Sequence, residues 1–200
     1  MKKFSEILKP FYSIIFGALF LLLYLNWLQG GGATLAMGIV AMIFSAYYLA
    51  IGIISVVAGD KLVGQTKRII NMLTICLFPL FMFVMFLIST INGAGGYGPN
   101  GWVIAILSMI ASIVLVVVYA MSTFVDHAAL KNVTQLMSFV FLLALILHVV
   151  FTTAGNARIL GNLNIVEVAF YFVYGGMLLS SLSSLGETEK PAPEQTPTAE

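Results

Sequence analysis

The sequence contains very little charge, and this shortage defines the class of protein. Only 8% of its 200 residues are Asp, Glu, Lys or Arg, whereas 60% are hydrophobic. Soluble domains carry about 25% charged residues. A chain with so few charges cannot cover a water-facing surface, so most of it must face lipid. The net charge of +1 also argues against nucleic acid as a partner, because phosphate binding needs a clustered basic face.

Residues for redox, metal and acid–base chemistry are scarce as well. Cys76 is the single cysteine, which excludes an intramolecular disulfide and a cysteine metal site. The two histidines, His127 and His148, fall near opposite ends of predicted spans, so they cannot hold a haem together within one chain. No Ser-His-Asp set or pair of carboxylates falls at one depth. We therefore expect no catalytic residues, no metal site and no cofactor, and we predict that the protein is not an enzyme.

The apolar residues form six long runs. A helix needs about 20 apolar residues to cross a bilayer, and the runs predict transmembrane helices at 11–29, 33–58, 69–92, 101–124, 133–153 and 164–185. We predict an all-α integral membrane protein in which these six helices form three helical hairpins.

The ends of the chain differ from this transmembrane domain at 11–185. Residues 1–10 are predicted to be a cytoplasmic segment, and the Pro-, Thr- and Glu-containing residues 186–200 a disordered cytoplasmic tail. The first apolar run is longer than the roughly 7–15 residues of a secretory signal, and no clear Ala-x-Ala site follows it. We expect it to stay attached as a signal anchor.

Basic residues are distributed unevenly between the predicted connectors. Lysine and arginine favour the cytoplasmic side of a membrane. With the six spans above, only Arg158 falls on the outer side, and eight of the nine Lys and Arg residues fall on the inner side: Lys2, Lys3, Lys9, Lys61, Lys67, Arg68, Lys131 and Lys190. This bias predicts a plasma (inner) membrane protein, multi-pass, with both termini in the cytoplasm.

Small and hydroxylated residues recur at steps of three and four in the second, fourth and sixth spans, which places each set on one helical face. Two interpretations fit: close contact between helices, with hydroxyl groups bonding across it, or a polar path lined by these spans. The sets are Gly38, Ala41, Ser45, Tyr48, Gly52, Ser55 and Gly59; Ser108, Ser112, Tyr119, Ser122 and Asp126; and Glu167, Tyr171, Tyr174 and Ser181.

Two local motifs have simple explanations. The stretch GAGGYG at 93–98 fits G-x-G-x-x-G, but it joins two spans and no carboxylate follows at the ribose position, so we expect a flexible turn rather than a dinucleotide site. Pro79 lies in the middle of the third span. It removes one backbone hydrogen bond and is predicted to kink that helix.

The candidate site is a charge inside the last span. Glu167 lies about 5 Å into that helix and His148 about 7 Å into the fifth, so the two side chains fall at similar depth and are predicted to meet. Arg158 lies in the loop above them, Tyr171 shares the helical face of Glu167, and Asn26 falls at the same outer level. These five residues are the predicted ligand-binding set.

Two interpretations of Glu167 remain open. In the first, the carboxylate bonds to Arg158 and fixes the last outer loop, as a shallow structural tie. In the second, Glu167 and His148 form an outward-facing polar pocket that binds a small solute or a proton, and the pair titrates as a unit near neutral pH. Ionisable residues inside a span are costly and mark function by default, which favours testing the second interpretation.

Two families are similar to the chain in architecture. Six spans in about 200 residues with inner termini and an outer polar pocket resemble the substrate-binding S component of energy-coupling factor vitamin transporters. The first helix, FYSIIFGALFLLLYLNW, lacks the Ala-x-x-x-Ala contact motif of that family. The Gly- and Leu-rich hairpin FGALFLLLYLNWLQGGGATLAMGIV is similar to HdeD-like membrane proteins. The first resemblance implies solute binding in partnership with an ATPase module.

Two functions follow as hypotheses. The first is a small-solute transporter or its membrane-embedded binding subunit, with a site near the outer face between the fifth and sixth spans. The second is a non-catalytic accessory or structural subunit, held in a membrane complex through its small-residue faces. No ionisable group is predicted near the midplane, which argues against an ion-coupled carrier working alone. Expected partners are the lipid bilayer and either other membrane proteins or further copies of the chain.

Overall fold

All of the secondary structure in the described residues is helical. The structure is a computed structural model that describes residues 2–58, 64–91, 101–154 and 165–185. Six of its helices are long and apolar enough to cross a membrane, which confirms the predicted class. The elements are α1 (Lys2–Tyr24), the short 3-10 helix η1 (Leu25–Gln29), α2 (Ala33–Ala58), α3 (Gly64–Ile91), α4 (Gly101–Phe124), α5 (Ala128–Ala154) and α6 (Ile165–Leu185).

The helices follow the predicted spans but extend further at three charged ends. α1 begins at Lys2 rather than 11, so its predicted start is wrong. α2 and α4 begin and end at the predicted residues. α3 begins at Gly64 rather than 69 and α5 at Ala128 rather than 133, so both predicted starts are wrong. Apolar runs mark only the part of a helix in hydrocarbon, whereas the backbone stays helical where Lys67 and Lys131 reach the headgroup region. The predicted tail at 186–200 and the turn at 93–98 lie outside the described residues.

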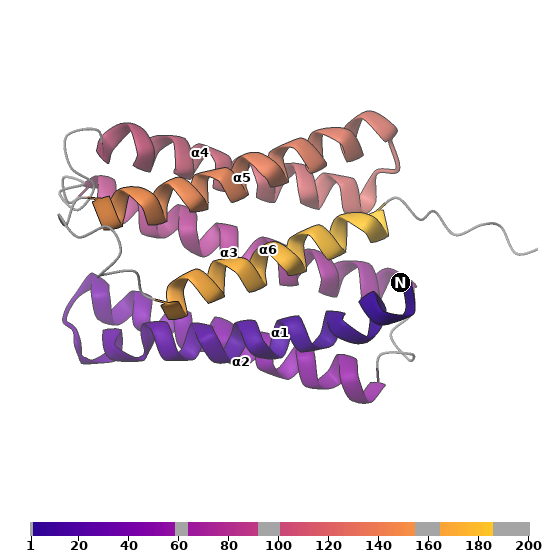
Figure 1. Ribbon diagram of the computed structural model, residues 1–200, viewed down its shortest axis with the longest axis horizontal. Coiled ribbons are helices and arrows are strands. Elements are labelled where there is room, and N and C mark those ends of the chain that lie inside the picture. Colours follow the sequence, from indigo (N-terminus) through magenta and orange to yellow (C-terminus); the bar gives the residue numbers. More distant parts are fainter. Residues whose placement is uncertain (1, 59–63, 92–100, 155–164, 186–200) are drawn as a thin grey trace, which may run out of the picture.

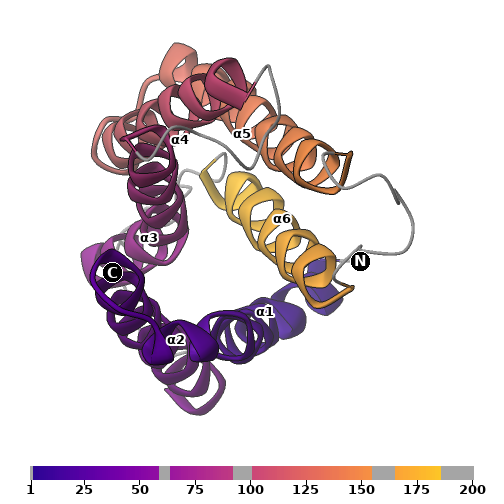
Figure 2. The ribbon, with the colours of Figure 1, turned by 90° about the vertical axis from the view of Figure 1, so that its left-hand side faces the viewer.

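Helices α3 and α6 lie between two pairs of helices. Figure 2 shows α1 and α2 on one side of the bundle and α4 and α5 on the other. The most extensive contacts join α1 to α2, α3 to α4, and α4 to α5, and α6 packs more extensively on α1 than on α5. The start of α1 and the end of α6 lie at the same end of the bundle (Figure 1).

Aromatic rings fill the centre of the bundle, where the ribbons of α3 and α6 stand apart in Figure 2. Phe16 of α1 stacks on Phe170 of α6, with ring centroids 4.4 Å apart and an interplanar angle of 11°. Phe78 of α3 meets Phe170 edge-on at 5.1 Å and Tyr174 at 4.5 Å. All four rings are fully buried. Such pairs stabilise a core beyond the area that they bury, and they leave this part of the interior apolar.

Pro79 lies inside α3, and a residue of α6 compensates for the hydrogen bond that it removes. A proline in a helix deprives the carbonyl four residues earlier of its donor, which here is the carbonyl of Ile75. The hydroxyl of Tyr174 donates to that carbonyl at 2.9 Å. In lipid, an unsatisfied backbone group costs several kcal/mol, so neighbouring helices must supply the partner. The Tyr174 hydroxyl therefore ties α6 to the proline break of α3.

Helices α1 and α2 approach each other closely at Gly17. A Cβ atom on Gly17 would lie 3.0 Å from the backbone nitrogen of Leu49 and 3.0 Å from the carbonyl oxygen of Ser45. The Ser45 hydroxyl donates to the Gly17 carbonyl at 2.7 Å. Helix pairs in membranes typically pack through small residues, and hydroxyl side chains donate hydrogen bonds from one helix to the other.

The helical faces predicted from the small and hydroxylated residues point into the bundle. Their hydroxyl groups bond to backbone carbonyls, in the same helix for Ser112 and Ser122 and across helices for Ser45 and Tyr48. This pattern supports helix contact rather than a polar path. The buried members are Gly38, Ala41, Ser45, Tyr48 and Gly52 on α2, Ser108, Ser112, Tyr119 and Ser122 on α4, and Tyr174 on α6.

The bond between Tyr174 and Ile75 makes a prediction about stability. Tyr174→Phe keeps the ring but leaves a buried carbonyl unsatisfied, so it should lower the free energy of unfolding by about 1–3 kcal/mol. In a Pro79→Ala background, the new backbone N–H can donate to Ile75, and the same substitution should cost less than about 1 kcal/mol. Reversible unfolding in mixed micelles of the four proteins in this double-mutant cycle measures both losses. Equal losses in the two backgrounds would contradict the assignment.

Candidate functional site

Three helices bring a polar cluster together at the end of the bundle opposite to the start of α1. His148 lies near the end of α5, and Glu167 and Tyr171 lie in the first two turns of α6. Phe86 of α3 completes the group. In Figure 1, α5 ends and α6 begins on the side away from the N-terminus. The positive-inside rule applied to the sequence predicts that this end faces outward.

One carboxylate oxygen is the centre of the cluster. The Tyr171 hydroxyl donates to Oε1 of Glu167 at 3.2 Å, and Nε2 of His148 lies 4.0 Å from the same atom. Glu167 and Tyr171 are four residues apart on one helix, a spacing at which side chains meet. Since both contacts use Oε1, the other oxygen, Oε2, receives no hydrogen bond from the described residues.

Aromatic rings pack against His148 in this cluster, and Glu167 is its more exposed member. The ring of Phe86 meets His148 edge-on at 5.3 Å, and Tyr171 meets His148 edge-on at 6.2 Å. The side chain of His148 is only 13% exposed, whereas that of Glu167 is 33% exposed. Apolar walls strengthen electrostatic interactions by excluding water. The Glu167 carboxylate therefore stays partly exposed in mainly aromatic surroundings.

The structure brings together three of the five predicted site residues. Glu167 and His148 meet, as their depths in the sequence predict, and Tyr171 joins them. Asn26 is exposed on η1, and none of the hydrogen bonds between described residues joins it to the other three. Arg158 lies outside the described residues, and with it the predicted tie to Glu167.

Sequence analysis missed two features of the cluster. Phe86 carries no signal of its own, because its contact with His148 depends on how α3 packs against α5. The hydrogen bond from Tyr171 to Glu167 does have a signal, namely the separation of four residues on a helix. Among the described residues, no group of three or more His, Cys, Asp or Glu side chains is arranged to hold a metal ion.

Comparison with known proteins adds no relative. The chain matches no family model, no curated protein and no solved structure. Neither of the two architectural resemblances is supported by these comparisons, and the function must be argued from the molecule itself.

The contacts of Glu167 predict how replacing this residue changes the free energy of unfolding. Glu167→Leu removes the acceptor of Tyr171 but also removes a carboxylate from partly apolar surroundings, and these effects oppose each other. We expect the free energy of unfolding to change by less than about 1 kcal/mol. Unfolding in mixed micelles measures the change. A loss of about 3 kcal/mol or more would show that Glu167 is a structural tie.

Proposed function

We propose that this protein is a multi-pass protein of the plasma membrane, built from three helical hairpins with both termini in the cytoplasm. Support comes from its six apolar helices and from the sided distribution of Lys and Arg. The start of α1 and the end of α6 share one end of the bundle (Figure 1). Exposed Lys67 and Arg68, in the first two turns of α3, fit a cytoplasmic surface.

Within this topology, we propose that the protein is the membrane-embedded binding subunit of a small-solute transporter. The observation that carries the proposal is the Oε1 atom of Glu167, which accepts a hydrogen bond from Tyr171 and lies 4.0 Å from Nε2 of His148. Ionisable side chains in a span are expensive and are functional by default. The Glu167 side chain stays one-third exposed, which leaves its carboxylate within reach of a ligand.

The chemistry of the cluster indicates the class of solute. Oε2 of Glu167 offers an acceptor, and the imidazole of His148 can donate or accept. Three aromatic side chains surround the polar atoms, namely Phe86, Tyr171 and, packed on Tyr171, Phe78. Such a site suits a small solute with an ammonium or N–H group on an apolar body.

The packed interior favours a binding subunit over a self-sufficient carrier. Phe16, Phe78, Phe170 and Tyr174 fill the bundle beneath the cluster, and among the described residues the buried polar side chains other than Tyr and Cys are all Ser or Thr. A coupled carrier would have ionisable groups near the midplane. A bound solute would therefore pass to a membrane-protein partner.

An exposed apolar helix face supports a second candidate, a non-catalytic accessory subunit of a membrane complex. α5 presents a strongly exposed apolar row, in which Leu136 is 62%, Phe139 59%, Leu143 55% and Ile146 60% exposed. These residues lie at steps of three and four and share one face. That face is available for another membrane helix as well as for lipid.

Ligand retention separates these candidates. If the protein binds a solute, native mass spectrometry after mild-detergent extraction from its own membrane should show a retained small molecule, with or without an ATPase module. Glu167→Gln should lose that molecule because the amide cannot supply the charge, while the protein still inserts and purifies. Asp126→Asn is the matched control, since it makes the same change at the far end of the bundle and should retain the molecule.

Two results would reject the transport proposal. One is a mass spectrum in which other membrane proteins accompany the chain and no small molecule does, which is the pattern expected of an accessory subunit. The other is a small molecule that Glu167→Gln retains as well as the original protein does.

The proposed topology predicts which residues face the outside of the cell. Gly31 is exposed, and a side chain added there would meet open space; Lys67 is exposed at the other end. In a Cys76→Ala background, Gly31→Cys should react with an impermeant maleimide in intact cells, and Lys67→Cys only after permeabilisation. The opposite labelling pattern would invert the topology.

A further inference from the structure

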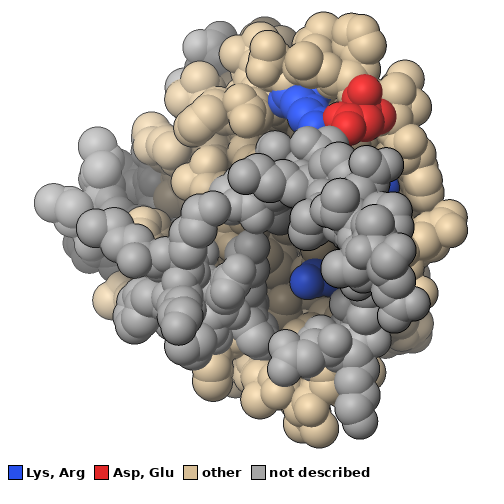
Figure 3. Space-filling view, turned by 90° about the vertical axis from the view of Figure 1, so that its right-hand side faces the viewer, with Lys and Arg blue, Asp and Glu red and all other residues tan. Residues whose placement is uncertain are grey.

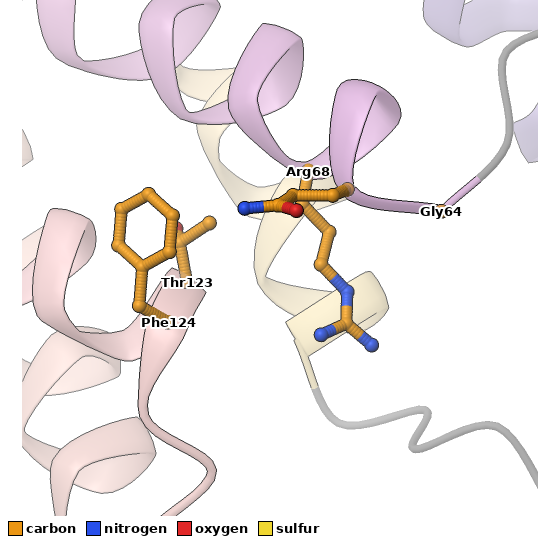
Figure 4. A pocket seen from close by; sticks show the side chains of 5 residues that line it. Gly64, Arg68, Thr123 and Phe124 are labelled. Carbon is orange, nitrogen blue, oxygen red and sulfur yellow. The ribbon is translucent and has the colours of Figure 1, made fainter.

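A pocket of about 380 Å³ lies at the end of the bundle opposite to the Glu167 cluster. It forms where the first two turns of α3 face the last turn of α4, and its lining residues are Gly64, Gln65, Arg68, Thr123 and Phe124. Figure 4 shows Arg68 extending from α3, with Thr123 and Phe124 on the α4 side. The proposed solute site uses none of these residues.

The lining of this pocket is suited to a phosphate group. Arg68 supplies a guanidinium with five N–H donors in a planar fork, which matches phosphate oxygens in pairs. Gln65 adds an amide that donates hydrogen bonds. Among the residues that the structure describes, no carboxylate lines the pocket, and the nearby Asp126 pairs with Lys131 at 2.6 Å. Figure 3, which looks onto this end, shows basic side chains on this face, one of them beside an acidic side chain.

The pocket also lies at the ends of two candidate membrane spans. Gly64 is the first residue of the candidate span Gly64–Ile88, and Phe124 is the last residue of Val103–Phe124. The ends of membrane-spanning helices lie near the lipid headgroups, so such a pocket is placed where a headgroup can reach it. Phe124 is 60% exposed, so its ring offers an apolar surface beside the donors of α3. A phosphate group matches the donors of α3, and an acyl chain attached to it matches the apolar surface of Phe124.

We propose that this pocket binds the phosphate headgroup of an anionic phospholipid from the leaflet at this end of the bundle. Basic pockets between transmembrane helices on the cytoplasmic side are a recurrent form of lipid recognition. Arg68 contacts the phosphate, Gln65 contacts the phosphate or the glycerol oxygens, and Phe124 packs on the start of the acyl chain. The site is independent of solute binding at Glu167, because it lies at the other end of the molecule.

Native mass spectrometry with defined lipids tests the site. The purified protein is delipidated and titrated with phosphatidylglycerol or, separately, with zwitterionic phosphatidylcholine. We expect a retained phosphatidylglycerol adduct and about tenfold weaker binding in Arg68→Gln, the change that follows from losing one charge-assisted pair. Lys67→Gln is the matched control, since it removes the same charge from the adjacent exposed residue outside the pocket, and should change binding by less than about twofold.

Arg68→Lys separates a pocket from diffuse attraction. It keeps the charge but loses the planar fork, so binding should weaken by about threefold or more if the guanidinium contacts the phosphate. The proposal is overturned if Lys67→Gln weakens binding as much as Arg68→Gln, if Arg68→Lys binds like the original protein, or if phosphatidylcholine binds equally well. It is also overturned if inorganic phosphate at millimolar concentration displaces the lipid, because the pocket would then be a site for a free anion.

Discussion

The arrangement of the bundle depends on one backbone carbonyl that has lost its helical partner. Pro79 removes the donor for Ile75 in the middle of α3, and the hydroxyl of Tyr174 replaces it at 2.9 Å. Because an unsatisfied carbonyl in lipid is costly, α6 must lie where that hydroxyl can reach. The stacked rings of Phe16 and Phe170 pack beside the hydrogen bond between Tyr174 and Ile75. One polar bond and an aromatic core thus set the position of the last helix.

The same helix carries the candidate site. Glu167, Tyr171 and Tyr174 lie at steps of four and three along α6, and Tyr171 packs on Phe78 with ring centroids 6.2 Å apart. The carboxylate is therefore held within two turns of the contact that fixes the helix on α3. Below the cluster the interior is apolar, and above it one-third of the Glu167 side chain is exposed. This division is the basis of the proposal that a solute binds at this end of the bundle and does not pass through its centre.

Much of this arrangement could be predicted from the sequence because it depends on local properties. Long apolar runs predicted the six candidate spans, and counting residues from the helix ends predicted that Glu167 and His148 meet. The pairing of Tyr174 with Ile75 could not be predicted, because 99 residues separate them and only the packing of α6 on α3 brings them together. The early starts of α3 and α5 were missed because hydropathy does not report helix that continues into the headgroups. The position of Phe86 beside His148 is likewise a property of packing.

The central claim is that a packed, water-free interior lies below the partly exposed Glu167 cluster. Hydrogen–deuterium exchange of the protein in lipid nanodiscs tests this claim most directly. Backbone amides around Pro79, in peptides covering 74–84, should exchange as slowly as those at 111–119 in the middle of α4, because Tyr174 and the rings exclude water there. Amides at 165–171, where α6 begins, should exchange faster. Rapid exchange at 74–84 would contradict this account, since it would mean that water reaches the centre of the bundle.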